Sequence, residues 1–178
     1  MAKRLQFVGN SSAVASVLDR CLTQRGERIA DLSIASPVLV VFLRHAGCIS
    51  CREALWDLSR MRTAIEQRGT RIVLVHMGDG KRVERAIDKY KLSLIDRISD
   101  STQELYRAFG LEQGRILQLL GPKLLWRTFA GVARYGIGLV SADPSQMPGV
   151  FLIEQSTIIR RFRHRTAADR PDYLALCE

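Results

Sequence analysis

The chain has 178 residues, of which 47% are hydrophobic and 25% charged, and this length and composition suit one globular domain with a sizeable core. The net charge of +9 comes mostly from arginines scattered along the sequence. No RNA-binding or helix-turn-helix pattern accompanies them, so we expect solvated helix faces and no specific nucleic-acid partner. No apolar run approaches the roughly 20 residues of a membrane-spanning helix, and no apolar stretch like that of a secretory signal follows the N-terminus. We therefore expect a cytoplasmic protein without a membrane span.

Helices and strands alternate along the first 110 residues. Runs of valine, isoleucine and leucine predict buried strands, and apolar residues spaced three and four apart predict helices with one buried face. Glycines and prolines mark the ends of several of these segments. The predicted helices are 11–25, 52–68, 81–90 and 100–110, and the predicted strands are 28–29, 38–43, 71–76 and 92–95. This alternation predicts a sheet with parallel strands and helices on both faces.

The C-terminal part of the sequence changes character. Two apolar runs, 150–153 and 157–162, are separated only by a short polar turn and predict an antiparallel hairpin. Asp169 is the predicted cap of a last helix. Before the hairpin lies the strongly apolar segment 111–145, which a Gly-Pro pair divides into two expected short helices. We expect this segment to pack over the sheet edge, to form a dimer surface or to act as a lid.

Two cysteines, Cys48 and Cys51, lie between the predicted strand 38–43 and the predicted helix 52–68. They therefore occupy the first turn of a helix, where unpaired N–H groups and the helix dipole favour a negatively charged sulfur. A thiol in this position ionises more readily than free cysteine, whose pKa is about 8.5, and the thiolate is the form that attacks disulfides and peroxides. Because the two thiols are also close enough to form a disulfide and reopen it, the motif predicts thiol redox chemistry.

Other interpretations of the cysteines have less support in the sequence. A zinc site needs a second pair of ligands, and His45 alone would leave the metal's coordination incomplete. Haem attachment is excluded because Arg52 stands where the motif requires histidine. A pair that has lost its activity stays open. Cys21 and Cys177 are expected to be bystanders, since a reducing compartment disfavours structural disulfides.

The order of elements, together with the cysteine motif, resembles the thioredoxin fold. More specifically, the sequence resembles peroxiredoxin-like members of the alkyl hydroperoxide reductase and thiol-specific antioxidant (AhpC/TSA) superfamily. The segments that carry the resemblance are 40–53, 100–110, 146–151 and 164–171. It covers about residues 35–178 and implies an α/β thioredoxin-like domain: a central mixed β-sheet with helices on both faces and a helical insertion, 111–145, before a cis-proline. Residues 1–34 would be an N-terminal helical and strand extension packed on this domain.

The resemblance implies two assignments of the cysteines. In thioredoxin-like oxidoreductases the first cysteine, here Cys48, attacks, and the second, here Cys51, resolves the mixed disulfide. In typical peroxiredoxins a Thr-x-x-Cys motif stands here, which would make Cys51 the peroxidatic residue. Both stay open, and we favour Cys48 because the first position is usually less covered by the sheet. Pro148 matches the cis-proline that faces the cysteines, with the backbone of Met147 turned outward toward an extended substrate.

Three cationic or titratable residues flank the motif: Arg44, His45 and Arg52. Positive charge near a thiolate lowers its pKa, and Arg44 could also hold a peroxide or carboxylate oxygen. His45 is either a proton shuttle or a turn residue. Each of the three could instead be a solvent-facing side chain.

The resemblance implies an antioxidant enzyme, a thiol-dependent oxidoreductase that cycles Cys48 and Cys51 between dithiol and disulfide while it reduces peroxides or protein disulfides. Such an enzyme binds no cofactor and needs an external thiol reductant, thioredoxin or glutathione. The alternative is a redox-sensing, protein-interaction module that oxidises without turnover and changes a partner surface near 111–145. The same segment is where we expect a homodimer contact.

Overall fold

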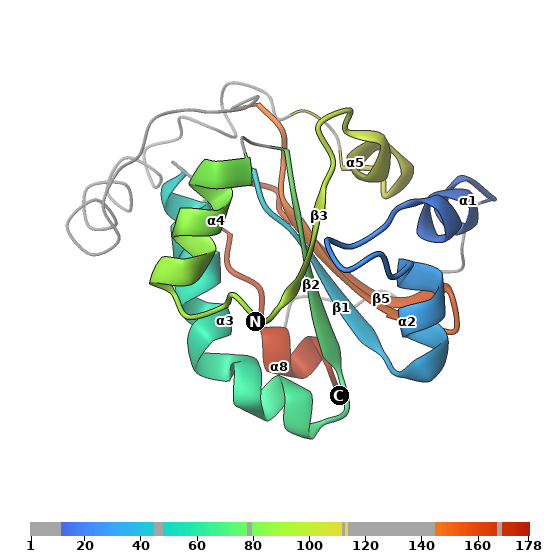
Figure 1. Cartoon of the computed structure of the whole chain (residues 1–178), viewed down its shortest axis with the longest axis horizontal. Coiled ribbons are helices and arrows are strands. Elements are labelled where there is room, and N and C mark those ends of the chain that lie inside the picture. Colours follow the sequence, from blue (N-terminus) through green and yellow to red (C-terminus); the bar gives the residue numbers. More distant parts are fainter. Residues whose placement is uncertain (1–11, 45–47, 78–79, 112, 114–144, 167–168) are drawn as a thin grey trace.

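The structure is a computed structural model. It describes residues 12–44, 48–77, 80–111, 113, 145–166 and 169–178 (Figure 1). The helices, dimer surface and lid expected within 111–145 lie outside these residues, apart from the ends of that segment. Among the helices of the described part, none is long and apolar enough to cross a membrane.

The centre of the molecule is a mixed five-stranded sheet in the order β3-β2-β1-β4-β5. Strands β1 (Val38–Phe42), β2 (Arg71–His76) and β3 (Asp96–Ser99) are parallel, and β4 (Gly149–Glu154) runs antiparallel to β1. Strand β5 (Thr157–Arg163) completes the predicted antiparallel hairpin with β4. The α/β fold class and the mixed sheet predicted from the sequence are confirmed.

Helices cover both faces of the sheet (Figure 1). One face carries α1 (Ser12–Arg20), α2 (Ile29–Ala35) and α5 (Glu104–Ala108), and the other carries α3 (Ile49–Gln67), α4 (Gly80–Lys89) and α8 (Tyr173–Leu176). Alternate residues of β1 enter the two cores, because successive side chains of a strand point to opposite faces. Val38, Val40 and Phe42 pack with the first helices, and Leu39, Val41 and Leu43 with the second.

The third strand differs from the prediction. Segment 92–95 is a turn, and the strand follows it at Asp96–Ser99. The apolar residues Leu92 and Ile95 are buried in the core, so their hydrophobicity signals burial and not extended backbone. The true strand begins with a charge because buried Asp96 pairs with Arg71 at 3.1 Å, a contact that the local pattern does not reveal.

Two N-terminal predictions are also corrected. The first helix ends at Arg20 rather than near residue 25, and the predicted strand 28–29 is reduced to one bridge between Leu22 and Arg28. Helix α2 begins directly afterwards and has seven residues, too few for the periodicity to stand out. The division of the chain at residue 35 stays a prediction.

The last helix is capped by a different aspartate from the one predicted. The side chain of Asp172 accepts a hydrogen bond from the backbone N–H of Ala175 at 3.1 Å and so caps α8. Asp169 instead accepts from the backbone N–H of Arg165 at 2.7 Å and holds the preceding turn. Both residues fit the general rule for caps, so the sequence alone could not choose between them.

Helix α5 fixes the carboxyl end of β1, which leads to the cysteine motif. The carboxylate of Asp100 accepts from the backbone N–H groups of Glu104 and Leu105 at 2.9 and 2.8 Å, as its predicted capping role requires. Tyr106, buried in α5, donates its hydroxyl to the carbonyl of Leu43 and lies 3.1 Å from that of Val75. The end of β1 is therefore held from the opposite layer of the molecule.

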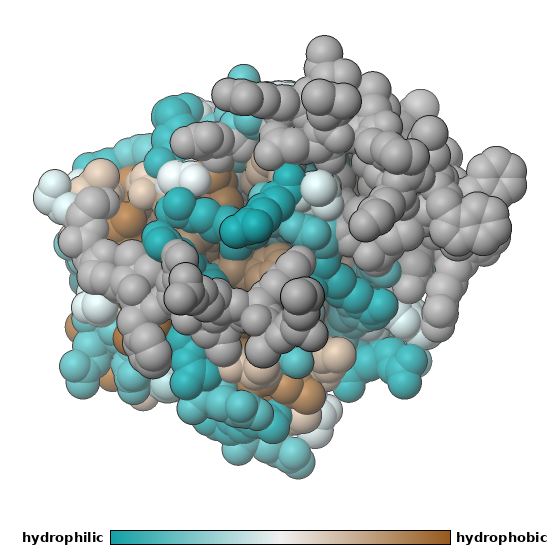
Figure 2. Space-filling view, turned by 180° about the vertical axis from the view of Figure 1, so that it is seen from behind, coloured by the Kyte–Doolittle hydropathy of each residue, from teal (hydrophilic) through white to brown (hydrophobic). Residues whose placement is uncertain are grey.

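Hydrophilic side chains cover most of the described surface that is visible from behind, with hydrophobic ones in separate patches (Figure 2). Within the described part of the chain, the large hydrophobic residues that are exposed are Leu22, Ile34 and Leu94.

Candidate functional site

The cysteine motif lies where β1 ends and α3 begins. Cys48 is the N-cap of α3, with an extended backbone, and its carbonyl accepts the first intrahelical bond, from Arg52 N–H at 3.0 Å. Its sulfur is therefore at the positive end of a 19-residue helix. Cys51 follows within the first turn, and both cysteines are free thiols.

The Cys48 thiol has donors on several sides. The hydroxyl of Ser50 lies 3.0 Å from its sulfur, and the guanidinium of Arg44 donates to it at 3.6 Å. A hydrogen bond with Cys51, the positive charge of Arg44 and the contact with Ser50 lower the pKa of Cys48 well below its ordinary value, against the opposing effect of burial. Cys48 itself is half-buried, so the thiol that ionises more readily is also the more accessible one.

Cys51 has the opposite environment. It is 3% exposed, and its sulfur accepts a hydrogen bond from the backbone N–H of Arg44 at 3.0 Å. Burial, together with the neighbouring Cys48, raises the pKa of Cys51 well above its ordinary value. The pair thus combines a thiol that ionises more readily than usual with one that ionises less readily.

Of the three flanking residues, Arg44 makes contacts with both sulfurs, through its side chain to Cys48 and its backbone to Cys51. Its side chain is buried, which strengthens its effect because a charge in a poorly solvated site is weakly screened. Arg52 is half-buried in the first turn of α3. His45 lies outside the described residues.

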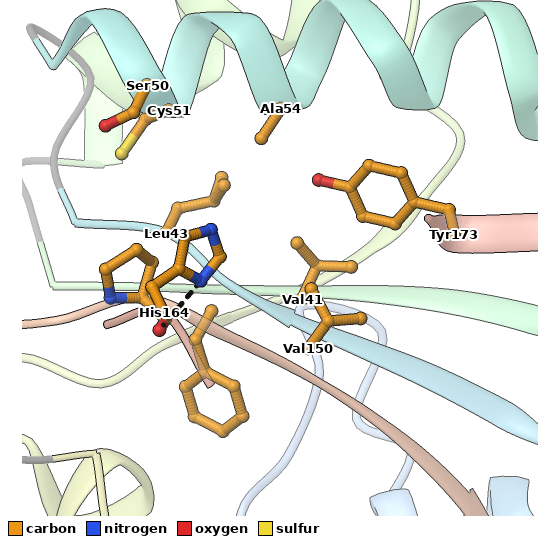
Figure 3. A pocket seen from close by; sticks show the side chains of 10 residues that line it. Val41, Leu43, Ser50, Cys51, Ala54, Val150, His164 and Tyr173 are labelled. Atoms are coloured by element: carbon orange, nitrogen blue, oxygen red, sulfur yellow. Dashed lines mark hydrogen bonds between the residues drawn. The ribbon is translucent and has the colours of Figure 1, made fainter. Parts of the chain in front are cut away.

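A small cavity of about 10 Å³, room for about one water molecule, lies beside Cys51. In Figure 3 the Cys51 sulfur, the Tyr173 hydroxyl and the His164 ring surround it. Pro148 also lines it, so this proline faces the cysteine motif, as the resemblance implies. The lining residues are Val41, Phe42, Leu43, Ser50, Cys51, Ala54, Pro148, Val150, His164 and Tyr173.

The predicted cis geometry at Pro148 is wrong, because the peptide bond after Met147 is trans. The trans form of an X–Pro bond is favoured by about 0.5–1 kcal/mol, and the surroundings here fit it. The Pro148 carbonyl accepts from the backbone N–H of His164 at 3.4 Å and so extends the β4–β5 pairing. Met147 is buried, and its carbonyl accepts from the side chain of Gln146 at 3.3 Å, so its backbone is not turned outward to a substrate.

Three residues near the sulfurs are absent from the sequence-based site: Ser50, Tyr173 and His164. Ser50 lies inside the motif, and a hydroxyl so close in sequence to two cysteines could have marked it as a site residue. Tyr173 and His164 come from the far end of the chain, and only the fold brings them to Cys51. Within the described residues, no three side chains of His, Cys, Asp or Glu gather where they could hold a metal ion.

The sheet order, the two helical layers and the paired cysteines at the start of α3 define a thioredoxin-like protein. The model of the AhpC/TSA family matches residues 20–162, and the chain belongs to this family. No curated protein matches the sequence significantly.

Solved structures show the same fold at low sequence identity. The bacterioferritin comigratory protein of Xanthomonas campestris, studied for alkyl peroxide reduction, is 13% identical with a TM-score of 0.60, over 94% of this chain and 90% of that one. The peroxidoxin BcpB of Mycobacterium tuberculosis is 12% identical with a TM-score of 0.57, over 81% and 79%. The MTB protein dsbF, in mixed oxidized and reduced forms, is 13% identical with a TM-score of 0.54, over 85% and 88%.

The contact between Arg44 and Cys48 gives a first prediction. Replacing Arg44 with glutamine removes a charge that favours the thiolate, so the pKa of Cys48 rises and less thiolate is present at pH 7. The pH profile of Cys48 alkylation by iodoacetamide should move to higher pH, and the rate at pH 7 should fall several-fold. Arg52→Gln is the matched control and should shift the profile less. An unchanged profile in Arg44→Gln would remove Arg44 from this role.

Proposed function

We propose that this protein is a thiol-dependent peroxidase of the AhpC/TSA family in which Cys48 attacks and Cys51 resolves. The observation that carries the proposal is the contrast between the two thiols: the pKa of half-buried Cys48 is lowered and that of buried Cys51 is raised. Such a contrast is what a nucleophile and its resolving partner need. The burial of Cys51 also argues against the assignment in which the second cysteine is peroxidatic.

The proposed cycle has three steps. The Cys48 thiolate attacks one peroxide oxygen, so that an S–O bond forms, the O–O bond breaks and the alcohol leaves after taking up a proton. The sulfur of Cys51 then attacks the resulting sulfenic acid, which forms the disulfide and releases water. An external thiol reductant, thioredoxin or glutathione, returns the disulfide to two thiols. The cycle needs no bound cofactor, and the reductants named suit a cytoplasmic protein.

The same thiolate could attack a protein disulfide. We favour peroxide because the chain belongs to the AhpC/TSA family and because one protein of similar fold is described by its alkyl peroxide reduction. Arg44 supports this choice as well, since its guanidinium next to Cys48 is a donor for the oxygen that becomes negative as the O–O bond breaks.

The proposal is tested by peroxide consumption with NADPH, thioredoxin reductase and thioredoxin, and in parallel with glutathione. We expect many molecules of hydrogen peroxide or an alkyl hydroperoxide to be consumed per protein, and little reduction of insulin disulfides. Insulin reduction without peroxide turnover would assign the protein to disulfide exchange. A single oxidation without turnover would favour the redox-sensing module.

Matched cysteine variants show which thiols are used. Cys21→Ser and Cys177→Ser should retain turnover, because burial raises the pKa of both thiols and they lie away from α3's first turn. Cys48→Ser should abolish it. Turnover that survives in Cys48→Ser would refute the proposal.

A further inference from the structure

The cavity beside Cys51 contains an imidazole that the proposed cycle does not use. His164 follows directly after β5, and its ring lines the same space as the sulfur of Cys51. The ring packs edge to face against Phe162, with centroids 5.0 Å apart. Its position is therefore fixed in part by packing against β5.

The orientation of the ring is fixed by a backbone carbonyl. The Nδ1 atom of His164 lies 3.1 Å from the carbonyl oxygen of Pro148. A carbonyl oxygen only accepts, so Nδ1 carries a hydrogen and donates it, and in the neutral ring Nε2 is then the basic nitrogen. In Figure 3 this second nitrogen is on the side of the ring that faces α3 and the cavity.

Cys51 has to lose a proton before it can resolve Cys48. Burial and the neighbouring sulfur keep it protonated in the resting protein, and a buried thiol has limited access to hydroxide from the solvent. The cavity that both Cys51 and the imidazole line has a volume of about 10 Å³, which suits one water molecule, and Ser50, Tyr173 and His164 offer that water polar partners.

We infer that His164 accepts the proton of Cys51 through a water molecule in this cavity, and so assists disulfide formation. The inference rests on the proposed function. His164 acts through the water and orients it, so it is a positioning residue and a proton acceptor that does not contact the peroxide.

The step balances in atoms and charge. The Cys51 proton moves through the water to Nε2 of His164 while the Cys51 sulfur attacks the sulfur of the Cys48 sulfenic acid. The S–S bond forms, the S–O bond breaks, and the leaving hydroxide takes up a proton from solvent and departs as water. The imidazolium then gives its proton to solvent, and the histidine returns to its neutral form. An imidazole suits this task because its unperturbed pKa is about 6.5.

Several other charged and titratable groups of the described residues lie near the cavity. Burial raises the pKa of Tyr173 on α8, which keeps it a neutral hydroxyl. Arg44, at the end of β1, contacts the sulfurs. Asp57 of α3 forms an ion pair with Arg170 at 2.6 Å, so its carboxylate already has a charged partner. Further charged groups nearby, among the residues that the structure describes, are Glu53, which pairs with Arg170, and Arg163 and Arg165, which flank His164 in the chain.

The test separates the two chemical steps of a single turnover. Reduced protein is mixed with one equivalent of hydrogen peroxide, quenched rapidly with an alkylating agent and analysed by mass spectrometry at pH 5 to 9. The first phase is conversion of Cys48 to the sulfenic acid, and the second is formation of the Cys48–Cys51 disulfide. In His164→Asn we expect an unchanged first phase and a second phase slowed on the order of 100-fold at pH 7. The pH dependence that His164 gives to the second phase in the wild type should disappear.

The variants separate a chemical role from a structural one. The asparagine amide can still donate to the Pro148 carbonyl, so the local hydrogen bond is retained. Phe162→Leu removes the ring packing but keeps the imidazole, and should retain the pH dependence of the second phase. A second phase in His164→Asn equal to that of the wild type, or equal slowing of both phases, would overturn the inference alone. Absence of the first phase in the wild type would overturn the proposed function as well.

Discussion

Replacing Cys51 with serine is expected to stop the reaction after its first step, with Cys48 left as a sulfenic acid. Among the described residues, the thiol beside Cys48 is that of Cys51, which is buried and accepts a hydrogen bond from the backbone N–H of Arg44. A serine in its place cannot form a disulfide with Cys48. Turnover with thioredoxin should fall by at least about 100-fold, since a step of the cycle is lost. Mass spectrometry should find Cys48 carrying one added oxygen, or a mixed disulfide when a small thiol is present.

Cys51→Ala provides the matched comparison. Serine retains a hydroxyl that can donate to the Cys48 thiolate, whereas alanine removes the hydrogen bond that contributes most to lowering the pKa of Cys48. Both variants should lack the disulfide, but the first oxidation should be slower in Cys51→Ala at pH 7, because less thiolate is present. Normal disulfide-linked turnover in either variant would contradict the assignment of Cys51.

The largest stability effect is expected for Phe42→Ala. Phe42 is 1% exposed, and its ring lies 5.0 Å from those of Tyr106 and Phe109 and 5.6 Å from that of Phe151. Truncation removes these contacts and leaves a cavity, so the free energy of unfolding should fall by about 3–5 kcal/mol. Urea denaturation should show a lower midpoint with an unchanged slope.

Leu94→Ala is the control for that experiment. Leu94 is 68% exposed, so its truncation should change the free energy of unfolding by no more than about 0.5 kcal/mol. A loss below about 1 kcal/mol in Phe42→Ala would mean that the aromatic cluster relaxes to fill the space, and that this core is less tightly packed than the ring distances indicate.

The sequence predicts best where local pattern and tertiary role agree. The strand Arg71–His76 has the predicted bounds because its apolar run is buried on both faces, and the β4–β5 hairpin follows from a short polar turn between apolar runs. The third strand is misplaced because Asp96 is stabilised by Arg71, which is distant in the sequence. The prediction of a cis bond at Pro148, which came from the family resemblance, was also wrong. The bond is trans, and the Pro148 carbonyl accepts a hydrogen bond from the backbone N–H of His164.

Part of the candidate site could likewise be predicted from the local sequence, and part could not. The helix-start position of Cys48 and Cys51 is visible in the local sequence, and so is the charge of Arg44. Their roles stay a prediction, now supported by the contrast in burial between the two sulfurs. The meeting of His164 and Tyr173 beside Cys51 could not be predicted, because it depends on how the β4–β5 hairpin and the last helix pack against β1 and α3.

The hydroxyl of Tyr106 connects helix α5 to the end of β1. It belongs to the helical layer opposite the cysteines, yet it binds the carbonyl of Leu43, one residue before Arg44. The position of the strand end that leads to the cysteines therefore depends in part on the helical layer on the other face of the sheet. The same strand end continues to Arg44, whose backbone N–H binds the Cys51 sulfur, so α5 helps to hold the backbone that positions this thiol.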